Sequence, residues 1–281
     1  MKLNGFEMSM RFIASRTVKL SALLCCILPI SVQIKAETEM SCSSMIATGN
    51  SEYPPFLWKK ADGSNELMGA NRLIIDEISR RLGIPIKLLH TGPWSRAQLE
   101  VKSGRADLMA GAFYTTERSD YMDYISPAFL HTSSVVWKRT GQRLDYSKKE
   151  DLINKRGVTV INNSFGQSFD DFSEKYLNII SVSGLEQAFK MLVAKRVDYV
   201  VYEKSPGLAY LNLLDMKTDV VSLASVSSEG LFLTLSKNST CNTVGMKQKL
   251  HNVLKTMSHD GFNEKALNQS LLDWNAFTHK S

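Results

Sequence analysis

Segments with the spacing of strands and segments with the spacing of helices alternate along most of this 281-residue chain. The clearest helical segment is residues 70–82, where Ile74, Ile78 and Leu82 fall four apart and Gly83 stands at the stop. Apolar segments of strand character lie at residues 43–48, 86–89, 108–110, 135–137, 158–161, 179–182, 199–202 and 231–235. Strands that alternate with helices predict an α/β fold, and the length favours two such units over one.

Further helical segments complete this alternation. Proline stands at the start of one of them, at Pro93, where its fixed φ suits the first turn. These helices are expected at residues 93–102, 148–154, 165–176, 185–194, 205–214, 244–257 and 262–271.

The first 36 residues have the pattern of a secretory signal peptide. Basic residues precede an apolar run over residues 20–32, and a small residue, Ala36, stands at the expected cleavage point. The run is short for a bilayer and contains Pro29, so we expect cleavage, a mature chain beginning near Glu37, and a periplasmic location. A retained membrane anchor is the alternative, and Met8 and Met10 are alternative starts to Met1.

The net charge of the mature chain gives no support to nucleic-acid binding. The whole chain carries a formal charge of +6, but residues 1–36 hold five basic residues and one acidic residue. Removing them leaves a net charge near +2, so the high isoelectric point comes largely from the targeting segment. We therefore expect no nucleic-acid partner.

Two of the four cysteines, Cys42 and Cys241, remain after the signal is removed. In an oxidising compartment such a pair is usually bridged, which predicts a disulfide; two buried free thiols are the alternative. The five histidines are scattered without metal-ligand spacing, and no zinc-binding motif is present. We expect neither a metal nor a cofactor.

The residues that follow the predicted strands are the ones placed to bind a ligand. Open α/β sheets bind ligands beyond the carboxyl ends of their strands, where loops and helix N-termini present unpaired N–H groups. In this chain those positions are residues 50–53, 111–116 and 162–166, together with Glu203.

Several short motifs occur in a fixed order along the mature chain. They are Gly49-Asn-Ser-Glu-Tyr-Pro-Pro-Phe56, Asp62-Gly63, Gly69, Ser103-Gly-Arg-Ala-Asp107, Thr115-Thr-Glu-Arg118 and Tyr124-Ile-Ser-Pro127. In this order and spacing they resemble the amino-acid class of type II periplasmic solute-binding proteins, over essentially the whole mature chain. The resemblance implies a two-lobed α/β fold with two hinge crossings: a first lobe of residues 40–131 and 229–281, and a second lobe of residues 132–228.

The resemblance also implies which residues bind a carboxylate. Arg118 aligns with the arginine that holds the α-carboxylate of the ligand, and Thr115 or Thr116 stands where the family uses a hydroxyl and an N–H beside it. Independently, a guanidinium fork matches a carboxylate through two charge-assisted hydrogen bonds. Ser164 and the N–H groups of Phe165 and Gly166 would meet the same carboxylate. The alternatives are a surface ion pair for Arg118 and simple helix capping by Ser164.

Other positions would bind the rest of the ligand. The family places an acidic residue at the end of a strand to take the ligand ammonium, and here that residue is Glu203. Asn50 departs from the pattern, because many relatives carry a second aspartate there. Tyr53 and Trp94 are the expected aromatic walls, and Phe113 would narrow the pocket.

The function implied by this resemblance is capture of a small carboxylate-bearing ligand, an amino acid above all, by closure of two lobes. A monomer is expected, and its partner would be the permease of an ABC importer or, as in some relatives, a signalling receptor. The alternative is a dehydratase-like enzyme on the same fold, with Glu203 or His131 as its acid or base. The chain has no nucleophile motif that would favour an enzyme.

Overall fold

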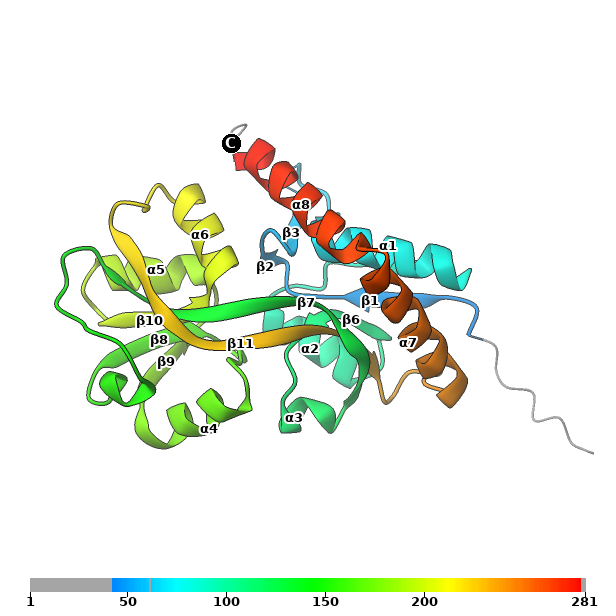
Figure 1. The fold of residues 1–281 in the computed structure, drawn as a ribbon, viewed down its shortest axis with the longest axis horizontal. Helices are drawn as coiled ribbons and strands as arrows, with labels where there is room; N and C mark the ends of the chain where they lie inside the picture. The colour runs from blue at the N-terminus through cyan, green and yellow to red at the C-terminus, as the bar shows by residue number, and fades with distance from the viewer. Residues whose placement is uncertain (1–41, 61, 279–281) are drawn as a thin grey trace, which may run out of the picture. The chain divides into compact units, whose positions relative to one another are not determined.

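The computed structural model describes residues 42–60 and 62–278, and the predicted signal peptide lies outside them. Its strands are β1 (Met45–Thr48), β2 (Glu52–Tyr53), β3 (Leu57–Lys59), β4 (Leu67–Met68), β5 (Ile86–Leu88), β6 (Leu108–Ala112), β7 (Met122–Arg139), β8 (Arg156–Val160), β9 (Asn178–Val182), β10 (Tyr199–Glu203) and β11 (Val220–Ser236). Its helices are α1 (Ala70–Leu82), α2 (Trp94–Lys102), α3 (Thr116–Ser119), α4 (Gln167–Tyr176), α5 (Leu185–Val193), α6 (Lys204–Leu213), α7 (Val244–His259) and α8 (Phe262–Thr278), with a 3-10 turn at Lys149–Leu152. The α/β fold class is confirmed (Figure 1).

The strands form one mixed sheet in the order β5-β1-β6-β11-β7-β10-β8-β9, and a small sheet of β2, β3 and β4. Parallel pairs lie at both ends of the large sheet, β5 with β1 and β1 with β6 at one end, and β10 with β8 and β8 with β9 at the other. We call the part built around β5, β1 and β6 the first lobe, and the part built around β10, β8 and β9 the second lobe.

Two long antiparallel strands, β7 and β11, belong to both lobes (Figure 1). One end of β11 pairs with β6, and the far end of β7 pairs with β10. Between these ends the two strands pair with each other, with register shifts between Ser222 and Ser225 and between Ser225 and Ser227. These are the two crossings that the resemblance implied, in the form of continuous strands.

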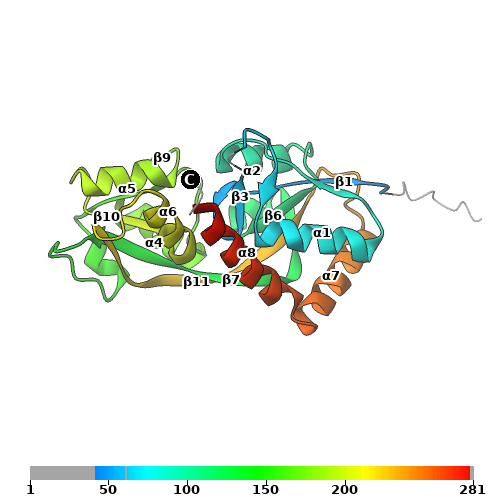
Figure 2. The same ribbon diagram turned by 90° about the horizontal axis from the view of Figure 1, so that it is seen from above.

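The helices cover the sheet lobe by lobe. Helices α1, α7 and α8 lie with the first lobe, and α4, α5 and α6 lie with the second (Figure 2). Helix α1 buries Ile74, Ile75 and Ile78 on one face, as its apolar spacing predicted. It ends at Gly83, whose φ of 68° is the left-handed conformation that glycine adopts without strain.

The secondary structure differs from expectation in the lengths of several elements, and it contains the short elements β2, β3, β4 and α3, which were not expected. The helix expected at residues 148–154 is only a 3-10 turn, Lys149–Leu152. Strands β7 and β11 extend well beyond the short segments expected at 135–137 and 231–235, and α8 continues to Thr278. Helix α4 begins at Gln167 rather than at residue 165, so Phe165 and Gly166 belong to the loop before it.

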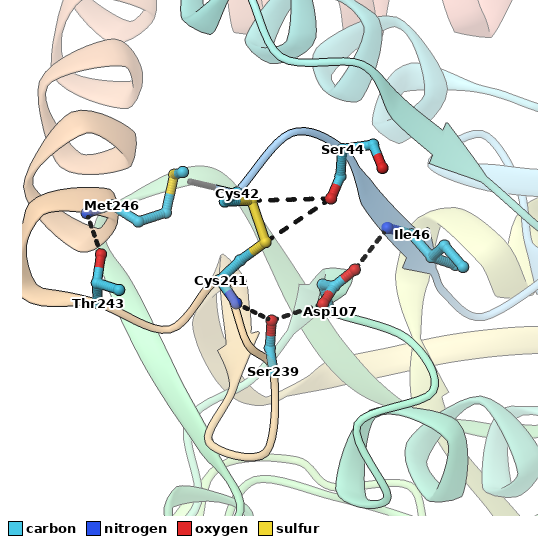
Figure 3. Close-up of a disulfide and its surroundings, with 8 residues drawn as sticks. All are labelled: Cys42, Ser44, Ile46, Asp107, Ser239, Cys241, Thr243 and Met246. Carbon is cyan, nitrogen blue, oxygen red and sulfur yellow. Dashed lines mark hydrogen bonds between the residues drawn. A yellow bond between two sulfur atoms is a disulfide. The ribbon is translucent and has the colours of Figure 1, made fainter. Parts of the chain in front are cut away.

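Cys42 and Cys241 form a disulfide with a Cα–Cα distance of 5.0 Å, which confirms the predicted pairing (Figure 3). The bond ties the chain ahead of β1 to the loop ahead of α7, 199 residues apart in sequence. The Asp107 carboxylate holds the same region together by accepting hydrogen bonds from Ile46 N at 2.7 Å and from Ser239 Oγ at 2.5 Å. The disulfide therefore fastens elements within the first lobe.

An aromatic cluster connects α8 to the second lobe. The rings of Trp58 on β3 and Trp274 on α8 lie 5.2 Å apart in an edge-to-face arrangement. Ala209 of α6 belongs to the same apolar cluster, and all three side chains are buried. The two lobes thus share an apolar contact besides the long strands.

Within the described residues, no helix combines the length and apolar character needed to cross a membrane.

Candidate functional site

The carboxyl ends of four strands meet where the two lobes face each other. The chain continues from β1 into Asn50, from β6 into Phe113 and α3, from β8 into residues 161–166, and β10 ends at Glu203. This is the position at which open α/β sheets bind ligands.

The structure sorts the nine predicted site residues into three groups. A small cavity is lined by Asn50, Tyr53, Trp94, Arg118 and Glu203. An adjoining groove is lined by Thr115, Ser164 and Phe165, and again by Arg118. Thr116 lines neither, because its side chain is exposed at the start of α3, although its backbone N–H donates to Gln167 Oε1 at 3.0 Å.

Arg118 is only 5% exposed and sits at the centre of the site. Its backbone N–H is fixed by Thr115 Oγ1, which caps α3 at 3.1 Å. Its guanidinium donates to Phe113 O at 3.3 Å and to Asn162 O at 2.8 Å, and it stands over the Trp94 ring at 5.3 Å from the centroid. The alternative of a surface ion pair for Arg118 is therefore wrong.

The carbonyl of Asn162 accepts hydrogen bonds from three donors of the first lobe. Besides Arg118, Trp94 Nε1 donates to it at 3.0 Å and Gln98 Nε2 at 3.3 Å. Asn162 has a φ of 58°, a left-handed conformation in which asparagine is enriched. This turn directs a backbone acceptor from the second lobe at donors of the first.

Glu203 is 2% exposed, and its carboxylate has little support. Asn163 Nδ2 donates to its Oε2 at 3.4 Å. Burial raises the pKa of Glu203 to about 7, against the opposing effects of its hydrogen bonds and of Arg118. A ligand ammonium beside this carboxylate would relieve the cost of its burial.

Tyr53 forms the wall on the Glu203 side of the small cavity. Its ring stacks on Phe56 at 5.0 Å and meets Tyr202 edge to face at 6.5 Å. Burial, and then the nearby Glu203 carboxylate, raise the pKa of Tyr53 well above its ordinary value. Its hydroxyl faces the Glu203 carboxylate and, as a hydrogen-bond donor, lowers the pKa of that group.

Asn50, in contrast, is engaged by its own loop. Its Oδ1 accepts from Glu52 N at 3.0 Å. The amide therefore shapes the loop that carries Tyr53, and it faces the small cavity from there.

The loop that contains Ser164 and Phe165 is held by a carboxylate of the chain itself. Asp170, in the first turn of α4, accepts from Ser164 Oγ and from Phe165 N, the latter at 2.8 Å. Gly166 N donates in turn to Ser164 Oγ at 3.3 Å. All three donors that the sequence assigned to a ligand carboxylate thus already have acceptors within the loop.

The two spaces on either side of Arg118 differ greatly in volume. The small cavity has a volume of about 20 Å³, and the adjoining groove between α2, α3 and α4 has about 510 Å³. A cavity of about 20 Å³ holds little more than one water molecule. A ligand of amino-acid size would therefore not fit between Arg118 and Glu203 in this structure.

Two residues outside the predicted positions, Asp170 and Asn71, belong to this site. Asn162 and Asn163 lie within the predicted segment 162–166, but no role had been assigned to either of them. Asn71 is 2% exposed, lines the small cavity and donates to Ala110 O at 2.6 Å, while its Oδ1 has no partner among the described residues. One signal could have found it: Asn71 stands two positions after Gly69, where the pattern of the resembled family has an aspartate.

Phe113 narrows the small cavity as expected, since it is buried and lines that cavity. His131, one of the two candidate acids or bases of the alternative function, is exposed on β7. In the described part of the chain, no three His, Cys, Asp or Glu side chains are grouped so that they could hold a metal ion.

Residues 45–271 match the bacterial extracellular solute-binding proteins, family 3. This match covers most of the chain. The chain belongs to that family. It is therefore placed among binding proteins rather than enzymes, and the resemblance seen in its motifs is confirmed.

Solved structures with the same fold accompany this family 3 match. The arginine-bound form of a truncated ArgBP from T. maritima is 20% identical, with a TM-score of 0.63, covering 76% of this chain and 96% of that one. The substrate-binding protein AbpA of an amino acid ABC transporter from Streptococcus pneumoniae, bound to L-arginine, is 18% identical, with a TM-score of 0.66 and coverages of 84% and 96%. A histidine kinase sensor domain with similarity to periplasmic binding proteins is 18% identical, with a TM-score of 0.69 and coverages of 81% and 96%. A comparison with curated proteins found no match.

Proposed function

We propose that this family 3 protein captures a small zwitterionic ligand, an amino acid, between its two lobes. The observation that carries the proposal is the pair of buried opposite charges, Arg118 and Glu203, which line one small cavity from different lobes. An α-carboxylate at Arg118 and an α-ammonium at Glu203 would neutralise both. The names of the similar structures, two of them bound to arginine, support this ligand class.

The remaining site residues receive matching roles in this proposal. Thr115, Ser164 and Phe165 would complete the carboxylate subsite with Arg118, while Tyr53, Asn50 and Asn71 would face the rest of the ligand. Trp94 would form the wall behind the Arg118 guanidinium, against which it already lies. Thr116 would act only through its backbone N–H, which bridges to α4.

Closure of the lobes would be the signal that reports the bound ligand. We propose that residues 40–131 and 229–281 move against residues 132–228, with the pivot in the central stretch where β7 and β11 pair. A ligand that contacts both lobes stabilises the closed state in proportion to its extra contacts there.

The chain would act outside the cytoplasm, delivered by its N-terminal signal peptide, and hand its closed form as a monomer to the permease of an ABC importer. The likeness to a histidine kinase sensor domain favours a second candidate output, a signalling receptor. Both outputs use the same ligand-closed state.

The test is a calorimetric screen of the mature chain with amino acids, each paired with the carboxylic acid that lacks only the ammonium. We expect an amino acid to bind with a Kd in the micromolar range or tighter, and its partner acid to bind at least tenfold more weakly. Near pH 7 the amino acid should also release roughly half a proton, because the ammonium keeps Glu203 ionised.

Two results of this screen would count against the proposal. Equal binding of an amino acid and its partner acid would remove the ammonium subsite. Binding of neither would remove the ligand class.

A further inference from the structure

We infer that Asp170 is an internal competitor for the ligand carboxylate, and that it weakens the binding of carboxylate ligands in the cleft. The inference rests on the proposed function, because it concerns the same carboxylate subsite. Asp170 belongs to none of the expected ligand-binding positions. It acts by occupying the donors that a ligand needs.

The geometry places the Asp170 carboxylate where a ligand carboxylate would bind the second lobe. Its Oδ1 accepts from Phe165 N at 2.8 Å and its Oδ2 from the Ser164 hydroxyl. These are two of the groups that stand after β8, at the carboxyl edge of the sheet. A ligand carboxylate can take them only if Asp170 gives up at least one of them.

Asp170 also places a negative charge beside the carboxylate subsite. It lines the same groove as Arg118, and the attraction between the two charges lowers the pKa of Asp170. Burial acts first and in the opposite direction, so the net effect is a raised pKa. A ligand anion that approaches Arg118 is therefore repelled by the Asp170 carboxylate, which the guanidinium already attracts.

Other acidic groups surround Asp170 and favour its protonation. Asp171 follows it on α4, and Glu229 approaches from β11. A Cβ at Gly166 would collide with the Glu229 carboxylate, so this loop is packed directly against the long strand. Burial and then the repulsion from Asp170 raise the pKa of Glu229. The charged groups that face Asp170 are therefore Arg118, Asp171 and Glu229.

The first lobe shows the same arrangement. Arg118 donates to Asn162 O, an acceptor contributed by the second lobe, at 2.8 Å. When a ligand carboxylate binds, its oxygens replace Asn162 O as an acceptor for Arg118 in the first lobe. They also replace the Asp170 carboxylate as an acceptor in the second lobe. Such exchanges contribute little net free energy for each hydrogen bond, so the full negative charge on Asp170 decides their balance.

The test compares Asp170→Asn and Asp170→Ala with wild type, using the amino acid selected by the screen as the probe. Asp171→Asn is the matched control, since it removes the same charge one residue along, from an exposed side chain bonded to Gln167. We expect Asp170→Asn to tighten the Kd about tenfold near pH 8, and the control to change it less than about twofold. Asp170→Ala should tighten it in the same direction, with thermal unfolding checking that α4 stays folded.

A pH series adds a readout that a purely structural role would not move. Because its pKa is raised, Asp170 of the wild type protonates at a higher pH than an ordinary aspartate as the pH is lowered, and it then loses both its charge and its acceptor strength. The ratio of the wild-type Kd to the Asp170→Asn Kd should then fall toward one. Contributions from Glu203 cancel in this ratio, because both proteins keep that residue.

Each outcome decides the matter. Unchanged or weaker binding in both Asp170 variants, with binding still abolished by Arg118→Ala, overturns the inference and leaves the proposed function standing. Equal tightening by Asp171→Asn also overturns it, because a general charge effect would then suffice. If neither the wild type nor any Asp170 variant binds a carboxylate ligand, the proposed function and the inference fail together.

Discussion

The two charged ends of the cleft are buried to a similar degree and supported very differently. Arg118 has two carbonyl partners and an aromatic face, contributed by both lobes. Glu203 has a long hydrogen bond from Asn163 and a weak one from the Tyr53 hydroxyl, and together they do not offset its burial. The chain thus supplies enough hydrogen-bond partners for the Arg118 guanidinium, but too few for the Glu203 carboxylate. A zwitterionic ligand would compete for partners at the first end and supply a missing one at the second.

The largest expected effect is on the well-supported end. Arg118→Ala should weaken binding of every carboxylate ligand by about 2–5 kcal/mol, because the ligand anion would be left desolvated and unpaired. Isothermal titration measures this loss. Arg96→Ala is the control, since that arginine is exposed on α2 and pairs there with Glu100. An unchanged Kd in Arg118→Ala would mean that the carboxylate binds elsewhere.

The next effect belongs to the under-satisfied end and appears without any ligand. The pKa of Glu203 is raised to about 7 in the folded chain, so folding favours its neutral form. The stability that this gives is complete below the unfolded pKa and is lost as the pH rises through 7. Glu203→Gln stays neutral and should exceed wild type by about 3 kcal/mol near pH 8, with the two converging below about pH 4.

Denaturant unfolding at several pH values measures this difference. Glu77→Gln is the control of opposite sign, because Arg80 and Arg81 hold the pKa of Glu77 at about 2. It should lose stability at neutral pH rather than gain it. A wild-type advantage over Glu203→Gln near pH 8 would show that Glu203 is well supported after all.

The smallest effect concerns a single hydroxyl. Tyr53→Phe should lower the free energy of unfolding by about 1 kcal/mol near pH 8, because it removes a hydroxyl that donates to the buried Glu203 carboxylate. The loss should shrink as the pH falls and Glu203 becomes neutral. Tyr124→Phe is the matched comparison: its hydroxyl donates to Phe113 O at 2.7 Å, an acceptor that does not titrate, so its loss should not depend on pH in this range. Denaturant unfolding at several pH values distinguishes the two variants, and a loss in Tyr53→Phe that does not change with pH would contradict the contrast between the two ends.

The sequence predicted the elements whose pattern is local. Helix α1 has the expected bounds, because its apolar residues repeat at the helical period and a glycine ends it. The middle of β11 was expected only from the resemblance, as a crossing near residues 224–230, because serines there, such as Ser225 and Ser227, carry no alternation of apolar and polar residues. Pairing with β7 makes that stretch a strand, and such pairing between distant segments leaves no local pattern.

The candidate site likewise contains residues that the sequence predicts and residues that it does not predict. Arg118 and Glu203 could be predicted, because a charged side chain just after a strand is conspicuous in an α/β sequence. The part played by Asn162 could not, since its acceptor is a backbone carbonyl that any residue type would offer. Asp170 looked like an ordinary acidic residue in the first turn of a helix, where such residues are favoured. Only the folded loop shows which donors it occupies.

The aromatic cluster between α8 and α6 gives this chain a built-in optical reporter. The indole nitrogens of Trp58 and Trp274 are buried without partners among the described residues, and Ala209 of the second lobe belongs to the same buried cluster. A rotation of the lobes that withdraws Ala209 would admit water to these rings, and the emission of an indole shifts to longer wavelength in polar surroundings. Trp94, which donates across the cleft to Asn162, would respond to the same rotation. Three of the four tryptophans therefore lie where one lobe meets the other. The intrinsic fluorescence of the unlabelled protein should change when the lobes open.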